Sequence, residues 1–139
     1  MYKKDNYMIE KETGFKPINR EQVVAAFKEL KTQRIENPWE QNTNTADAWK
    51  LYREFCDIET KKVDKSDDPK APLVLDQQIS IDMIITEAGF EPDEDNLETI
   101  LDFLEQDLET AKDIGDTKLI SELQEKIKTY QTMYDSLSE

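Results

Sequence analysis

The strongest hydrophobic pattern lies in the last third of the chain, where apolar residues recur at helical spacing. After Asp93, four leucines and an alanine occupy positions 97, 101, 104, 108 and 111, at intervals of 4, 3, 4 and 3 residues. A second stripe with similar spacing runs from Ile120 to Leu137. Because Gly115 and Asp116 provide a turn between the two stripes, the pattern predicts a long antiparallel helical hairpin.

The turn of this hairpin, residues 111 to 116, reads Ala-Lys-Asp-Ile-Gly-Asp. It resembles the turn between the paired helices of tetratricopeptide-type repeats, in which a small residue precedes a Gly-Asp turn. The resemblance covers about one hairpin, and no second copy follows at the period of about 34 residues typical of such arrays. We therefore interpret the segment as an ordinary tight turn between two helices, and we identify no family across the whole chain.

The amino-terminal half carries two further helical patterns. Asn19, with Gln22 three residues later, predicts the start of a helix, and Pro38 predicts its end near residue 36. An aromatic stripe that includes Trp49 and Phe55 predicts a second helix over about residues 45 to 59. Together with the hairpin, these patterns predict an all-α fold.

Residues 73 to 88 fit two different structures. Their first half partly alternates between apolar and polar positions, as a strand does, whereas Ile79, Met83, Ile84 and Ala88 fit a helix that Gly89 closes. We favour the helix, because a strand here would have no partner strand elsewhere in the chain. The complete prediction is therefore about five helices.

The domain organisation follows from the same patterns. Residues 1 to 18 show no period and predict an irregular arm, and residues 19 to 139 predict one helical domain. Within this domain, a charged, proline-bearing loop over residues 61 to 72 separates a neutral half, 19 to 60, from an acidic half, 73 to 139.

Charge distinguishes the two halves. Residues 1 to 70 hold 14 acidic and 14 basic side chains, whereas residues 71 to 111 hold 12 acidic side chains and no lysine or arginine. The formal net charge of −14 is therefore concentrated in one segment. Because an acidic chain is repelled by anionic lipid headgroups and by phosphates, we expect neither membrane nor direct nucleic acid binding. The expected partner is a protein with a basic surface.

The residue types present exclude most common enzyme classes. The chain has no histidine, which removes Ser-His-Asp and Cys-His arrangements and two-histidine zinc sites. Its three glycines do not form a phosphate-cradling loop, and a single cysteine, Cys56, leaves no intramolecular disulfide. A reducing compartment is the default for such a chain, so we expect a cytoplasmic protein. Because most common enzyme classes are excluded, we also expect that the protein is not an enzyme.

Carboxylates are the one group of potential metal ligands that is abundant in the chain. Pairs of acids three residues apart, the spacing seen in all-helical magnesium-dependent nucleotide pyrophosphohydrolases, occur at Glu54 and Asp57, Asp102 and Glu105, and Glu122 and Glu125. Since such pairs arise by chance among 32 acidic residues, we expect no metal or other cofactor. A magnesium-dependent hydrolase is the lowest-ranked alternative.

Four carboxylates in the first helix of the hairpin form a more ordered pattern. Their spacings of 4, 3 and 4 residues place them in one stripe, with no lysine four residues away to relieve their repulsion: Glu98, Asp102, Glu105 and Glu109. The stripe is interpreted either as a solvated face, paired with basic residues of the first half, or as a binding surface.

Two aromatic residues are further candidates for partner contacts. Phe103 points away from the leucine seam of its helix, and Trp39 lies in a polar loop. The alternative for Phe103 is burial against residues 73 to 88, and the alternative for Trp39 is simple packing. Together with the carboxylate stripe, the two aromatic residues predict a protein-interaction module, whose sharpest form is an inhibitor that mimics nucleic acid on a basic site. The alternative is a structural or assembly protein that forms homo-oligomers through the hairpin.

Overall fold

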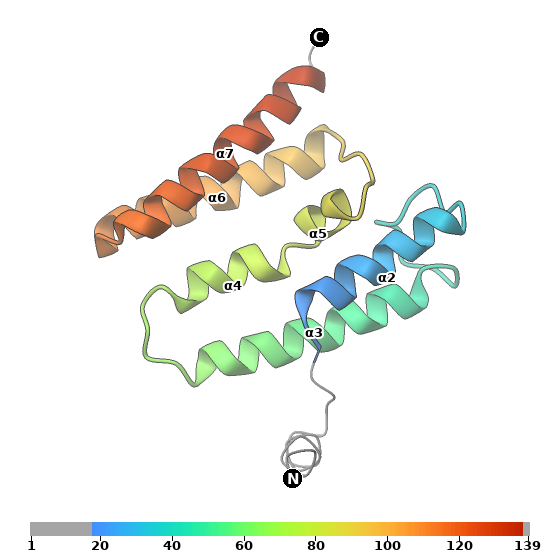
Figure 1. Cartoon of the computed structure of the whole chain (residues 1–139), viewed down its shortest axis with the longest axis horizontal. Coiled ribbons are helices and arrows are strands. Elements are labelled where there is room, and N and C mark those ends of the chain that lie inside the picture. Colours follow the sequence, from blue (N-terminus) through green and yellow to red (C-terminus); the bar gives the residue numbers. More distant parts are fainter. Residues whose placement is uncertain (1–17, 138–139) are drawn as a thin grey trace.

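The computed structural model describes residues 18–137 and is all-helical within that range, which confirms the predicted fold class. Its helices are α2 (Arg20–Thr32), α3 (Ala46–Asp64), α4 (Ala71–Ile79), α5 (Ile81–Glu87), α6 (Glu94–Ile114) and α7 (Thr117–Leu137). In Figure 1, α4 and α5 lie between the α6–α7 hairpin and the α2–α3 pair. The predicted arm, residues 1 to 18, lies outside the described residues except for Ile18.

The predicted C-terminal hairpin is confirmed, and its ends have clear local causes. Asp93 caps α6 by accepting a hydrogen bond from the Asn96 backbone N–H at 2.8 Å, and the Asn96 side chain accepts from the Asp93 N–H at 2.9 Å. Gly115 ends α6 with a left-handed φ of 83°. Asp116 then accepts from the Leu119 N–H at 3.1 Å, so the chain reverses within two residues.

Residues 73 to 88 contain no strand, but they form two helices rather than one. Ser80 separates α4 from α5 because its backbone is extended, with φ −62° and ψ 112°. Its hydroxyl also accepts from the Met83 N–H at 3.4 Å, which caps α5. This break makes six helices in the described chain instead of about five.

The ends of two helices differ from the predicted positions. α2 ends at Thr32 rather than near residue 36, because Arg34 adopts a left-handed φ of 62° and the Ile35 N–H donates to the Leu30 carbonyl at 3.0 Å. This turn packs the Ile35 side chain against the apolar core. α3 extends to Asp64, which makes the predicted loop over 61 to 72 shorter.

Two apolar clusters hold the helices together. The first consists of the hairpin seam, with Leu104 and Leu123 fully buried, covered by Leu73 of α4 and Met83 of α5. The second joins α2, α3 and α5, and in it the rings of Phe27 and Trp49 meet edge to face at 5.7 Å. Since α5 contributes to both clusters, the neutral and acidic halves share one continuous structure.

Candidate functional site

The four carboxylates that the sequence singled out are all exposed on α6. We call Glu98, Asp102, Glu105 and Glu109 the acidic stripe. α6 carries eight acidic residues and one lysine, a net charge of −7, which is half of the chain's −14. At about 1.5 Å per residue, the stripe extends over about 16 Å of helix.

The two ends of the acidic stripe have partners within the chain, whereas its centre has none among residues 18–137. The Tyr134 hydroxyl of α7 lies 3.0 Å from Glu98 and 3.2 Å from Glu94, and its hydrogen bond to Glu98 raises the pKa of Tyr134 to about 12. Lys112 lies 3.5 Å from Glu109. Asp102 and Glu105 therefore form the open part of the stripe.

Basic residues of the first half make their contacts elsewhere. Lys31 donates to the Gly89 carbonyl at 2.6 Å and lies 5.9 Å above the Phe90 ring. Lys62 pairs with Glu59 of its own helix at 3.0 Å. Within the described part of the chain, no ion pair joins α2 or α3 to the acidic stripe.

The two predicted aromatic candidates lie at the edges of the core. Phe103 is half-buried and packs against the hairpin cluster. Trp39 is also half-buried, and its indole N–H donates to Asp82 at 2.8 Å. Asp82 accepts a second bond from the Asn96 side chain at 3.0 Å, which links Trp39 to the first turn of α6 rather than to the acidic stripe.

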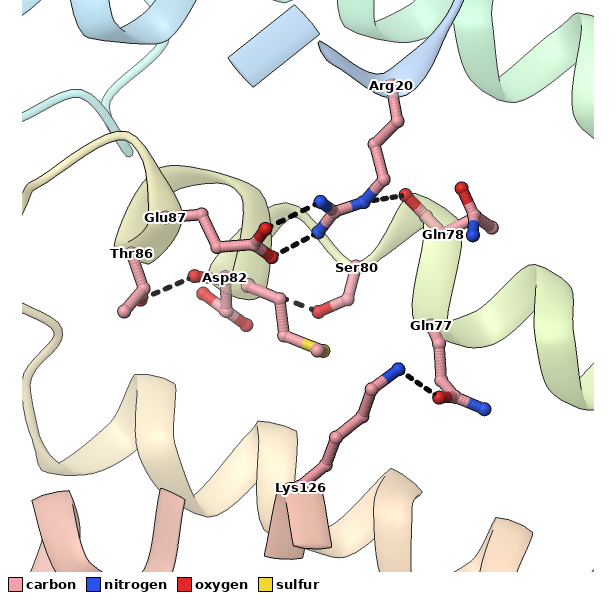
Figure 2. A network of polar contacts seen from close by, with 9 residues as sticks. Arg20, Gln77, Gln78, Ser80, Asp82, Thr86, Glu87 and Lys126 are labelled. Atoms are coloured by element: carbon pink, nitrogen blue, oxygen red, sulfur yellow. Dashed lines mark hydrogen bonds and ion pairs between the residues drawn. The ribbon is translucent and has the colours of Figure 1, made fainter. Parts of the chain in front are cut away.

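A second polar site, which the sequence did not predict, lies where α2, α4, α5 and α7 meet. Figure 2 shows Arg20 of α2 bound through both guanidinium arms to Glu87 of α5, with its Nε–H donating to the Gln78 carbonyl at 3.2 Å. Lys126 extends from α7 to the side-chain oxygen of Gln77 on α4. These contacts join residues 49 to 67 positions apart, so local sequence patterns carry no signal for them.

A pocket of about 370 Å³ opens beside these polar residues. Its walls include Met83, Tyr130, Arg20 and Lys126. Burial lowers the pKa of the half-buried Lys126, and the nearby Arg20 charge lowers it further, while Glu122 and Glu87 act in the opposite direction. The ammonium group of Lys126 in this pocket is therefore partly removed from water, which destabilises its charged form.

A third unusual group is Asp107, an acidic residue inside the contact of α6 with α4. Asp107 is 7% exposed, and its Oδ2 has no hydrogen-bond partner among the described residues. Burial, together with the adjoining Asp76 side chain of α4, raises the pKa of Asp107 to about 7. The sequence held a signal for it, because position 107 lies three residues after Leu104 and four before Ala111, on the seam of the hairpin.

Neither metal-site geometry nor comparison with known proteins assigns a function to these sites. Within residues 18–137, no three Asp, Glu or Cys side chains come together as a metal site would require. None of the described helices is long and apolar enough to cross a membrane. No protein-family model matches the chain, and neither the curated proteins nor the solved structures contain a significant match.

Proposed function

We propose that this chain is a non-enzymatic protein-interaction module whose acidic stripe binds a basic surface on a partner protein. The observation that carries the proposal is the exposure of four carboxylates on one face of α6, with Asp102 and Glu105 unpaired within residues 18–137. Like charges three and four residues apart destabilise a helix. A helix shaped by stability alone would place lysines among them.

The sharpest form of the proposal is an inhibitor that occupies the nucleic-acid-binding site of its partner. Successive carboxylates of the stripe lie about 4.5 to 6 Å apart along the helix axis, a spacing comparable to that of phosphates along one strand. A surface with this charge also attracts a basic partner over a distance of about 8 to 10 Å at physiological salt. Binding would therefore compete with nucleic acid and weaken as salt increases.

The alternative is a structural or assembly protein that oligomerises through the hairpin. The packing gives this alternative less support, since Leu73 and Met83 cover the apolar seam within a single chain. Light scattering over a range of concentrations tests it directly. A mass that remains that of the 16.3 kDa monomer argues against self-assembly.

The proposal is tested by capturing partners from a lysate of the source cells on the immobilised full chain, with and without competing duplex DNA. A stripe variant, E98Q/D102N/E105Q/E109Q, removes the four charges and keeps the side-chain shapes. A control variant removes the same number of exposed charges outside α6, at Glu29, Glu36, Glu40 and Asp67. Both variants change the formal net charge from −14 to −10.

The expected result separates the acidic stripe from bulk charge. Wild type and the control variant capture the same basic protein, duplex DNA releases it, and the stripe variant does not retain it. Equal loss with both variants would mean that total charge, and not the stripe, holds the partner. Retention of the partner by the stripe variant would show that the acidic stripe is not the binding site.

A further inference from the structure

We propose that the pocket beside Lys126 binds a small organic monocarboxylate, whose oxygens accept hydrogen bonds from the Lys126 ammonium and the Tyr130 hydroxyl. The pocket has a volume of about 370 Å³, within the range of roughly 300 to 1,000 Å³ usual for small-molecule sites. It uses none of the acidic-stripe residues. The inference therefore stands or fails independently of the proposed function.

Lys126 is the first reason to expect an anion. It is half-buried, yet no carboxylate among residues 18–137 lies within ion-pair distance of it, in a chain with 32 acidic residues. Its hydrogen-bond partner is the neutral amide of Gln77, which is 6% exposed and also donates to the Leu73 carbonyl at 3.3 Å. Partly buried charges are normally paired, so an anion beside this ammonium would offset its lost solvation.

Tyr130 supplies the second donor. It is 7% exposed and lines the same pocket, four residues after Lys126 and therefore on the same face of α7. Its hydroxyl has no hydrogen-bond partner within the described part of the chain. Burial raises the pKa of Tyr130 to about 12, so the hydroxyl keeps its proton and is available to donate at neutral pH.

The other walls of the pocket select among anions. Arg20 is already engaged by both oxygens of Glu87 and by the Gln78 carbonyl, so it serves as a wall and as the link between α2, α4 and α5. Glu87 and Glu125 also line the pocket, and their charges repel a dianion such as phosphate more than a monoanion. Met83 and the Tyr130 ring offer an apolar surface for a hydrocarbon body.

The test uses benzoate as the probe, with acetate and inorganic phosphate for comparison. The full chain is titrated with each sodium salt, and binding is followed by changes in backbone amide NMR signals at constant ionic strength. Lys126→Met removes the charge and keeps the apolar stem, while Tyr130→Phe removes the hydroxyl alone. Lys128→Met is the matched control, because Lys128 is exposed on the same helix. Thermal unfolding verifies that each variant is folded.

Benzoate is expected to bind saturably, with signal changes confined to the residues around the pocket, and to bind more tightly than acetate or phosphate. K126M should weaken binding about 10- to 100-fold, and Y130F about fivefold, as expected for charged and neutral hydrogen bonds. K128M should leave the affinity unchanged. Equal weakening by K126M and K128M, or phosphate binding as tight as that of benzoate, would overturn the proposal, as would the absence of saturable binding.

Discussion

Replacing Asp107 with asparagine tests the energetics of the α4–α6 contact. The Asp107 carboxyl is buried, one of its oxygens has no partner in the described chain, and Asp76 adjoins it. Asparagine has nearly the shape of a protonated aspartate, and its amide group can donate to Asp76 as a protonated carboxyl would. The variant therefore resembles the protonated state of Asp107 at every pH.

The sign of the effect follows from the raised pKa. Because the folded chain holds the Asp107 proton up to a pH of about 7 and the unfolded chain loses it near the ordinary value of 3.8, stability is highest below pH 3.8 and falls as the pH rises toward 7. The full difference corresponds to at most about 4 kcal/mol, at about 1.36 kcal/mol per pKa unit. Since Asp76 is exposed and water reaches that side of the pair, we expect about 2 to 3 kcal/mol.

Urea unfolding at several pH values, followed by the fluorescence of Trp39 and Trp49, measures this effect. The free energy of unfolding of D107N minus that of wild type isolates the one residue, because the other carboxyl groups are common to both proteins. This difference should be near zero at pH 4 and should reach about 2 to 3 kcal/mol in favour of D107N above pH 8.

Asp102→Asn is the matched control, since it is the same substitution on an exposed position of the same helix. Its effect should stay within about 0.5 kcal/mol of wild type across the same pH range. A stability gain for D107N that does not change with pH would refute the assignment of the ionisation cost to Asp107. A loss of stability at pH 8 would refute it as well.

Two further predictions concern α6 and its turn. The stripe variant used above should be more stable than wild type by about 1 to 2 kcal/mol at low salt. It removes six like-charge pairs of α6, worth about 0.2 to 0.5 kcal/mol each, and loses the one favourable pair of Glu109 with Lys112. Urea unfolding in 1 M salt should abolish most of the gain, and a gain independent of salt would contradict this reasoning. Gly115→Ala should lower the free energy of unfolding by about 1 kcal/mol in the same assay, because alanine is strained at a φ of 83°, while open space surrounds the added Cβ. Gly115→Asn should lower it less, since asparagine tolerates the left-handed conformation. Equal losses for the two variants would point to a steric cause.

Local signals explain which parts of the fold could be predicted. The hairpin followed from apolar spacing and from Gly115, because both the helix faces and the turn depend on residues close together in the sequence. The break at Ser80 also had a local signal, a serine able to cap the following turn, but the apolar residues on both sides favoured a continuous helix. The early end of α2 depends on Ile35 packing into the core, which no local pattern contains.

The candidate sites divide in the same way. The acidic stripe could be predicted, since its spacing places four side chains on one face of a helix whatever surrounds that helix. The pocket could not, because it needs Arg20, Gln77 and Lys126 to meet from three different helices. Asp107 was predictable in principle as an acid on an apolar seam, although its neighbour Asp76 on another helix was not.

We propose that the acidic stripe, rather than total charge, recognises a basic partner. The most direct measurement compares the amount of partner bound by wild type, the stripe variant and the control variant at equal salt, before and after addition of duplex DNA. We expect equal binding of the partner by wild type and the control variant, its release by duplex DNA, and loss of binding with the stripe variant. Binding by the stripe variant at the level of wild type would contradict it.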